Sequence, residues 1–348
     1  MKLGQAFDPR HNALNLWRLI LATGVIFWHS FPLTGNTIDF QPAVRLLSEV
    51  WVDGFFTVSG FLITAGWMRR PHLGEYWRAR FLRIFPGLWV CVAVTAFVIA
   101  PIAAAVKHSS LPLSAEFAYV VNNGLLNVFY AGINGTPKDI PWPGVWNGSL
   151  WTLVFELLCY IAVCVLGLLG LLKRQWVLPT LFVASAVWSA YVSYPTMAQQ
   201  TIPQMLARFA VVFLAGALIH QYRDAIPARW SLVALCGVIV VASGFAQNYR
   251  LIAALPLAYA IIVSGALVRR FPLRNDISYG MYIYAFPVQQ LLATLGLVSL
   301  HPTVFFLVAA LCTIPLAAAS WFVVEKRAMA LKHPKRQQVA AGTSSHPK

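Results

Sequence analysis

Long apolar runs alternate with short polar connections along almost the whole of the 348-residue chain. A helix that crosses about 30 Å of hydrocarbon needs around 20 consecutive apolar residues. The pattern predicts about ten membrane-spanning helices, at residues 14–33, 48–67, 84–106, 149–172, 176–194, 203–221, 230–247, 250–268, 277–298 and 302–324. Polar residues interrupt the runs at 203–221 and 277–298, so we expect these two helices to face protein.

Basic residues gather in alternate connections between these runs. The other connections hold only Arg45, Lys107, Lys138 and Arg250. Cytoplasmic loops of membrane proteins carry the excess of Lys and Arg, and both chain ends belong to the basic set. The sequence therefore predicts an all-α integral membrane protein with both termini in the cytoplasm, and five arginines lie in one cytoplasmic stretch, residues 68–86.

Two segments depart from this alternation. The longest connection, residues 107–148, contains the apolar segment 117–132, which is short for a span. We expect an interfacial or re-entrant helix there that covers a cavity. After Ala330 the chain is polar and basic, which is typical of disorder. We therefore predict a transmembrane domain at residues 1–330 and a disordered cytoplasmic tail at residues 331–348.

Composition supports the membrane assignment and excludes nucleic acid as a partner. Hydrophobic residues make up 59% of the chain and charged residues 11%, whereas soluble domains carry about 25% charged residues. The net charge of +15 is divided into short blocks between apolar runs. None of these blocks has the interleaved aromatic residues of a single-strand binder.

The first predicted span carries two ionisable residues, Arg18 and His29. They are eleven positions apart, close to three helical turns, so both project from one face, roughly 16 Å apart along the axis. Taken alone, Arg18 could extend to the lipid headgroups and His29 could be a neutral side chain bonded to a neighbouring helix. Their shared face favours a functional stripe.

Three carboxylates also need an explanation. Glu156 lies about seven residues into the fourth run, and at that depth it must be paired, hydrated or protonated. An ion pair with Arg208 is the structural alternative to a functional role. Asp53 opens the polar part of the second run, with Ser59 and Gly60 deeper, and Gly60 would allow close helix contact. Asp276 could be a plain N-cap.

An imidazole, a buried carboxylate and several arginines, without a metal-ligand cluster, favour group transfer without a metal. Histidine is the usual general base near neutral pH, and a carboxylate could orient its ring. Arginines bind phosphates in bidentate fashion. We therefore expect Arg78, Arg80 and Arg83 to bind a phosphorylated cytoplasmic donor.

The chain resembles the acyltransferase-3 family of bacterial membrane acyltransferases. The resemblance rests on five elements in the family's order: Arg18 and His29 in the first helix, DGFFTVSGF at 53–61, RFLRIFP at 80–86, WTLVFELLCY at 151–160 and SYGMYIYAFP at 278–287. Together they span nearly the full chain. One departure is Ala285, where many members have a histidine, so a second catalytic histidine is not expected.

The resemblance implies a ten-helix domain in the bacterial inner membrane that moves an acyl group, usually acetyl, from cytoplasmic acyl-coenzyme A to a hydroxyl of a carbohydrate or glycolipid. It implies roles for His29 and Arg18 in catalysis or donor handling, for Arg80 and Arg83 at the donor face, and for Glu156 in the acceptor half of the site. We expect the catalytic residues to be His29, Arg18 and Glu156. For substrate binding we expect the polar and aromatic motif residues Asp53, Trp151, Tyr160 and Tyr279.

Two questions stay open at this level. A glycan exporter or flippase without covalent chemistry would also place Arg, His and Glu within the membrane, although the chain has no internal repeat of the kind transporters often show. For a transferase, His29 could act as a general base or as a transient acyl acceptor. The sequence does not select the acceptor.

Overall fold

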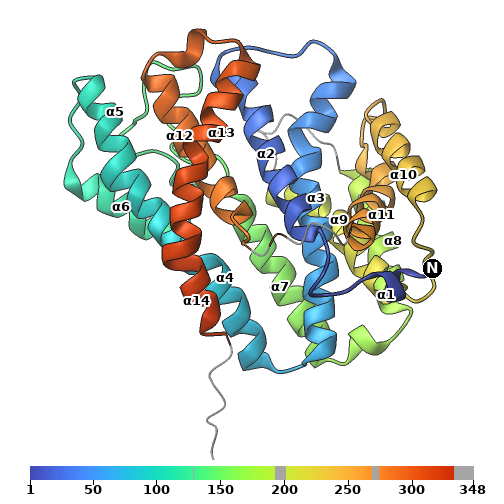
Figure 1. Cartoon of the computed structure of the whole chain (residues 1–348). Helices are drawn as coiled ribbons and strands as arrows, with labels where there is room; N and C mark the ends of the chain where they lie inside the picture. The colour runs from blue at the N-terminus through green and yellow to red at the C-terminus, as the bar shows by residue number, and fades with distance from the viewer. Residues whose placement is uncertain (128, 193–200, 269–272, 274, 333–348) are drawn as a thin grey trace, which may run out of the picture.

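Helices account for the regular structure of the chain. The computed structural model describes residues 1–127, 129–192, 201–268, 273 and 275–332, and these contain no β-strand (Figure 1). The predicted all-α class is therefore confirmed for the described part of the chain. Most of the predicted tail, residues 333–348, lies outside it.

Each of the ten predicted spans overlaps a helix. Six helical segments in the described residues are long and apolar enough to cross a membrane. Four are single helices: α2 (Leu14–Leu33), α3 (Gln41–Arg69), α9 (Ile202–Gln221) and α11 (Arg250–Leu267). The other two are composite: Leu73–Val106 contains α4 (Leu73–Val94), η1 (Thr95–Ile99) and α5 (Ala100–Val106), and Pro302–Ala330 contains α13 (Pro302–Ala319), η5 (Ser320–Glu325) and α14 (Lys326–Ala330). Three further apolar helices are shorter: α7 (Thr152–Leu168), α8 (Val177–Tyr191) and α10 (Trp230–Ser243). The remaining predicted span corresponds to α12 (Ser278–Thr294). The chain is thus a helical membrane protein with several apolar spans.

The two spans expected to face protein do so. Most residues of α9 are buried, and α12 is buried along almost its whole length. Helices α3 and α9 approach closely through two glycines. A Cβ atom on Gly60 would lie 1.9 Å from the carbonyl oxygen of Phe213, and one on Gly216 would lie 2.0 Å from that of Thr57. Small residues permit this approach, as expected for Gly60.

Helix α12 connects α2 to the long connection of residues 107–148 through two adjacent glutamines. The Nε2 atom of Gln289 donates to the carbonyl oxygen of Ile26 and to the hydroxyl of Ser30, both at 3.0 Å. The Nε2 atom of Gln290 donates to the carbonyl oxygens of Trp142 and Val145 at 2.9 and 2.6 Å. This pair therefore fixes the helix that carries His29 relative to the loop that carries Trp142.

The expected helix over 117–132 is displaced toward the N-terminus. It is α6 (Leu113–Gly124), and it packs on the C-terminal half of α4 and on η1. The Trp89 indole donates to the carbonyl oxygen of Gly124 at 3.0 Å, and the rings of Phe97 and Phe117 lie 5.2 Å apart. The described residues beyond Gly124 in the expected segment are not helical, and Asn123, near the end of α6, donates to the carbonyl oxygen of Tyr130 at 2.9 Å.

Candidate active site

A cavity of about 780 Å³ lies where α2, α3 and α4 meet the N-terminal segment and the C-terminal turn. Seven of its lining side chains are basic: Arg10, Arg18, Arg69, Arg70, Arg80, Arg83 and Lys332. Glu75 and Asp276 are the acidic lining residues. The excess of positive charge makes this cavity suitable for a large anion.

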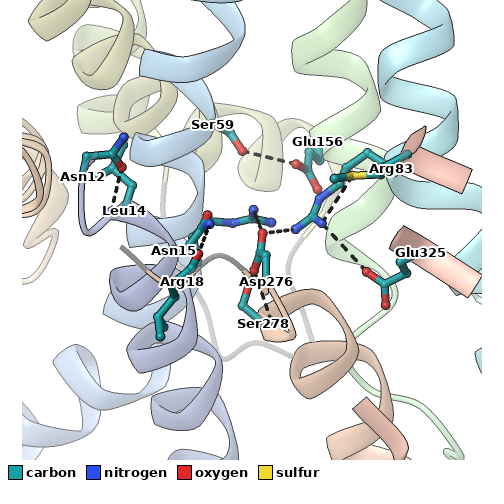
Figure 2. Close-up of polar contacts among 12 residues, drawn as sticks. Asn12, Leu14, Asn15, Arg18, Ser59, Arg83, Glu156, Asp276, Ser278 and Glu325 are labelled. Carbon is teal, nitrogen blue, oxygen red and sulfur yellow. Dashed lines mark hydrogen bonds and ion pairs between the residues drawn. The ribbon is translucent and has the colours of Figure 1, made fainter. Parts of the chain in front are cut away.

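Asp276 joins two of the predicted arginines. Its Oδ2 atom lies 2.5 Å from Arg18 Nη1 and 2.7 Å from Arg83 Nη2 (Figure 2). Its Oδ1 atom accepts from the backbone N–H of Ser278 at 3.2 Å. Burial raises the pKa of Asp276, but Arg18, Arg83 and the bonds from Ser278 outweigh burial and lower this pKa to about 2. Asp276 therefore does more than satisfy the start of α12.

Arg83 also faces a carboxylate that the sequence analysis did not single out. Glu325, 1% exposed, places its Oε2 atom 3.8 Å from Arg83 Nη1, and it accepts from the Ser320 hydroxyl at 2.9 Å. The Tyr279 ring lies 5.6 Å from the Arg83 guanidinium, and its hydroxyl donates to the carbonyl oxygen of Ile84. Arg83 is thus held in place by Asp276, Glu325 and Tyr279. A lone Glu directly after the last predicted span, 302–324, was the signal for this role.

Arg80 has a different environment. Its guanidinium lies 5.9 Å from the Tyr76 ring and 5.7 Å from the Tyr160 ring, and it lines the cavity. Its Nε atom is buried and lacks a hydrogen-bond partner among the described residues. Arg78 is exposed and is not among the residues that line the cavity. The three arginines predicted to act together therefore have three different surroundings.

Glu156 belongs to the same region as these arginines. Its carboxylate accepts from the hydroxyl of Ser59 at 3.2 Å (Figure 2). It also accepts from the hydroxyl of Tyr160. The alternative ion pair with Arg208 is wrong, because the described carboxylates paired with Arg208 are Glu49 and Asp53. Glu156 thus lies near the arginines of the cavity, since its partner Tyr160 adjoins the Arg80 guanidinium.

Asp53 lies in a closed ionic cluster between α3, α9 and α11. It is fully buried and lies 3.3 Å from Arg208 Nε and 2.6 Å from Arg250 Nε. Glu49 pairs with the same two arginines, and the Tyr249 hydroxyl donates to Asp53. The sequence predicts that Arg250 lies in a connection between spans, but its side chain is buried, with 2% of it exposed. Trp151 packs on this cluster, 5.8 Å from the Arg208 guanidinium.

His29 lies away from this cavity and faces protein. Its ring is 5.1 Å from the Phe286 ring and 6.1 Å from the Trp142 ring. Its Nδ1 atom bonds to the carbonyl oxygen of Val25 at 2.9 Å. A carbonyl oxygen only accepts, so Nδ1 carries a proton, and in the neutral ring the lone pair is therefore on Nε2. The expectation that a carboxylate orients this ring is wrong, because a backbone carbonyl does so.

The described part of the chain contains no group of three His, Cys, Asp or Glu side chains that could hold a metal ion. Arg80 and its neighbours in the cavity can bind anions, and His29, which lies away from the cavity, can accept a proton. Continuous helix over Leu14–Leu33 places Arg18 and His29 on one face of α2, as predicted.

Comparison with known proteins shows which family the chain resembles along most of its length. The model of the acyltransferase-3 family, described as an acyltransferase domain, matches residues 11–322. An O-acetyl transferase of Shigella phage Sf6 is 28% identical over 344 residues, which cover 94% of this chain and 98% of the relative. Nodulation protein 10 of Rhizobium leguminosarum bv. viciae is 27% identical over 360 residues, covering 92% and 94%. No solved structure matches the chain.

Proposed function

The chain belongs to the acyltransferase-3 family and is an acyltransferase, and we propose that it moves an acetyl group from acetyl-coenzyme A to a carbohydrate hydroxyl. The proposed acceptor is a sugar unit of a surface or secreted polysaccharide, or its glycolipid precursor, at the bacterial inner membrane. Another acyl-coenzyme A could replace acetyl-coenzyme A in the same site. The basic cavity is the observation that carries the proposal.

The donor phosphates would bind in the basic cavity. Coenzyme A carries several phosphate charges, and guanidinium groups bind phosphate in bidentate fashion. Arg80 supports this role because its Nε atom is buried without a partner among the described residues. Arg18 and Arg83 are held by Asp276, so they would shape the inner wall and contribute charge. Arg78, exposed and outside the lining, is not part of this proposal.

The pantetheine arm would then extend along α2 from Arg18 toward His29. Eleven helical positions correspond to roughly 16 Å, which an extended pantetheine can span. In the proposed reaction, Nε2 of His29 accepts the proton of the acceptor hydroxyl as its oxygen attacks the thioester carbonyl. The new C–O bond forms, the C–S bond breaks, and the leaving coenzyme A thiolate takes up the proton that Nε2 of His29 accepted, which returns the ring to its neutral form.

The acceptor would approach from the side of the long connection of residues 107–148. The Trp142 ring adjoins His29, and its backbone is held to α12 by Gln290. An indole face beside the base suits a sugar ring. Asp53 and Trp151 lie in and against the closed ionic cluster, so direct acceptor contacts from them would require that cluster to open. Tyr160 and Tyr279 adjoin Arg80 and Arg83 and fit the donor side better.

The test uses purified protein in nanodiscs with acetyl-coenzyme A labelled in the acetyl group and a glycan fraction from the native host. Label transferred to glycan, with coenzyme A released in equal amount, supports the proposal. Arg80→Ala should raise the donor KM, whereas exposed Arg78→Ala serves as the matched control. Failure of the wild-type protein to transfer label from acetyl-coenzyme A to any glycan fraction would overturn it.

A further inference from the structure

We infer that Lys332, in the turn after α14, is a phosphate-binding residue of the donor cavity. This inference rests on the proposed function, since it assigns a residue to the coenzyme A site. Lys332 lies ten positions beyond the end of the family match at residue 322. It is also among the last residues that the structure describes.

The position of Lys332 follows from how the C-terminal segment packs on α4. Arg83 Nη1 lies 4.0 Å from the Met329 sulfur, and the backbone N–H of Lys332 donates to the carbonyl oxygen of Met329 at 3.1 Å. Both Met329 and Lys332 line the cavity. In Figure 1, α14 lies beside α4 at the end of the bundle where the described chain stops. The turn therefore forms part of the cavity wall.

The charges around Lys332 are not balanced. Arg18 and Arg83 pair with Asp276, and Arg83 also pairs with Glu325. No carboxylate of the described residues lies within 4.0 Å of the Lys332 ammonium. The segments outside the described residues contain no Asp or Glu, so they supply no side-chain counterion.

Burial, together with the nearby Arg80 and Arg83 guanidiniums, lowers the pKa of Lys332 from 10.5 to about 8. A group of cations that is unfavourable when empty becomes favourable when a polyanion fills it. Binding of a phosphate should therefore raise this pKa. It follows that donor affinity should fall as the pH rises above about 8, where the free Lys332 loses its charge.

The groups that face Lys332 do not obscure this pH dependence. Those of α4 are Arg80 and Arg83, and the rest of the cavity wall supplies Arg10, Arg18, Arg69, Arg70, Glu75, Tyr76 and Asp276. The ordinary pKa values of guanidinium and carboxyl groups, above about 12 and near about 4, lie outside the range from pH 6.5 to 9.5. The Tyr76 hydroxyl is engaged with the carbonyl oxygen of Tyr160. Acetyl-coenzyme A has no free thiol that would titrate in this range.

The experiment is titration calorimetry of full-length protein in neutral phosphatidylcholine nanodiscs, with acetyl-coenzyme A or the phosphate-free S-acetylpantetheine. Lys332→Ala should weaken acetyl-coenzyme A binding roughly tenfold below pH 8, with no change for S-acetylpantetheine. It should also remove the loss of affinity above pH 8. Lys332→Arg should keep full affinity up to pH 9.5, because its charge persists. The control is Lys326→Ala, since Lys326 is exposed and does not line the cavity.

The outcomes separate this inference from the proposed function. Unchanged binding by Lys332→Ala, with weakened binding by Arg80→Ala, would overturn the role of Lys332 and leave the donor cavity intact. Equal weakening by Lys332→Ala for both ligands would also overturn it, because a phosphate contact cannot affect S-acetylpantetheine. A wild-type protein that binds neither ligand would overturn the donor site of the proposed function.

Discussion

The Nδ1 atom of His29 donates a hydrogen bond to the backbone carbonyl oxygen of Val25, 2.9 Å away and one turn earlier on α2. This bond fixes the tautomer and the ring orientation without a charged partner. It leaves Nε2 with the lone pair of the neutral ring, which lies beside the Phe286 and Trp142 rings. The bond therefore prepares a neutral imidazole to accept a proton.

Replacement of His29 should abolish most transfer while leaving the fold intact. We expect His29→Ala and His29→Gln to lower kcat by about 10²- to 10⁴-fold, the usual contribution of a general base. Initial rates of label transfer by monodisperse protein provide the measurement. Acid-quenched wild-type protein examined by mass spectrometry then distinguishes the two chemical roles, since a transient acyl acceptor would carry acetyl on the peptide containing His29. A variant with nearly full kcat would exclude both.

Trp142 should determine acceptor affinity. We expect Trp142→Ala to raise the acceptor KM about tenfold and Trp142→Phe to raise it less, because a phenyl ring still stacks. Donor affinity should be unchanged. The control is Trp176→Ala, because the Trp176 indole is exposed and lies outside the connection of residues 107–148. An acceptor KM that is the same in wild-type and Trp142→Ala protein would refute this placement of the acceptor.

Asp276→Asn should destabilise the protein and change its acid response. Removing one partner of a largely buried ion pair costs about 3 kcal/mol or more, and Arg18 and Arg83 would both lose their bonds to Oδ2. The folded-state pKa of about 2 lies below the ordinary value, so this stabilisation is present above about pH 4 and is lost as the pH falls toward 2.

Thermal unfolding in detergent from pH 7 down to pH 3 tests this pH dependence. The midpoint for wild-type protein should fall across the lower part of this range more steeply than that for Asp276→Asn. Parallel curves for the two proteins would contradict the assigned linkage. The difference between the two unfolding midpoints at pH 7 measures how much stability Asp276→Asn loses.

The ionic cluster around Asp53 should prove structural. We expect Asp53→Asn to lower the unfolding midpoint by several degrees, because it leaves Arg208 and Arg250 with an incomplete set of charges in the protein interior. The Asp53→Asn protein that does fold should retain the wild-type acceptor KM. A raised acceptor KM at unchanged stability would restore the acceptor-binding role that the sequence suggested for Asp53.

Much of the fold follows from the sequence because lipid imposes a simple rule on helix length and composition. Residues 14–33 illustrate this: the predicted and observed helix limits coincide. Gly60 was also predictable, since small residues mark close helix contacts. Ranges such as 230–247, where the helix ends at Ser243, show that apolar composition continues past the last helical turn.

The site was less predictable because ion pairing depends on tertiary distance. Nothing in sequence spacing pairs Arg83 with Glu325, 242 positions later, or places Arg208 beside Asp53 and not Glu156. The arginines of residues 78–83 looked equivalent as a block of charge. Helical geometry separates them, since it exposes Arg78 and turns Arg80 and Arg83 toward the cavity.

The central claim is that the donor phosphates bind at Arg80, whereas the chemistry occurs at His29, some distance away on α2. Donor binding by two single variants, measured side by side, tests this claim. Calorimetry with acetyl-coenzyme A should give His29→Ala the wild-type Kd and Arg80→Ala a Kd raised at least tenfold, while His29→Ala transfers almost no label. Weak donor binding by His29→Ala together with wild-type binding by Arg80→Ala would contradict the account.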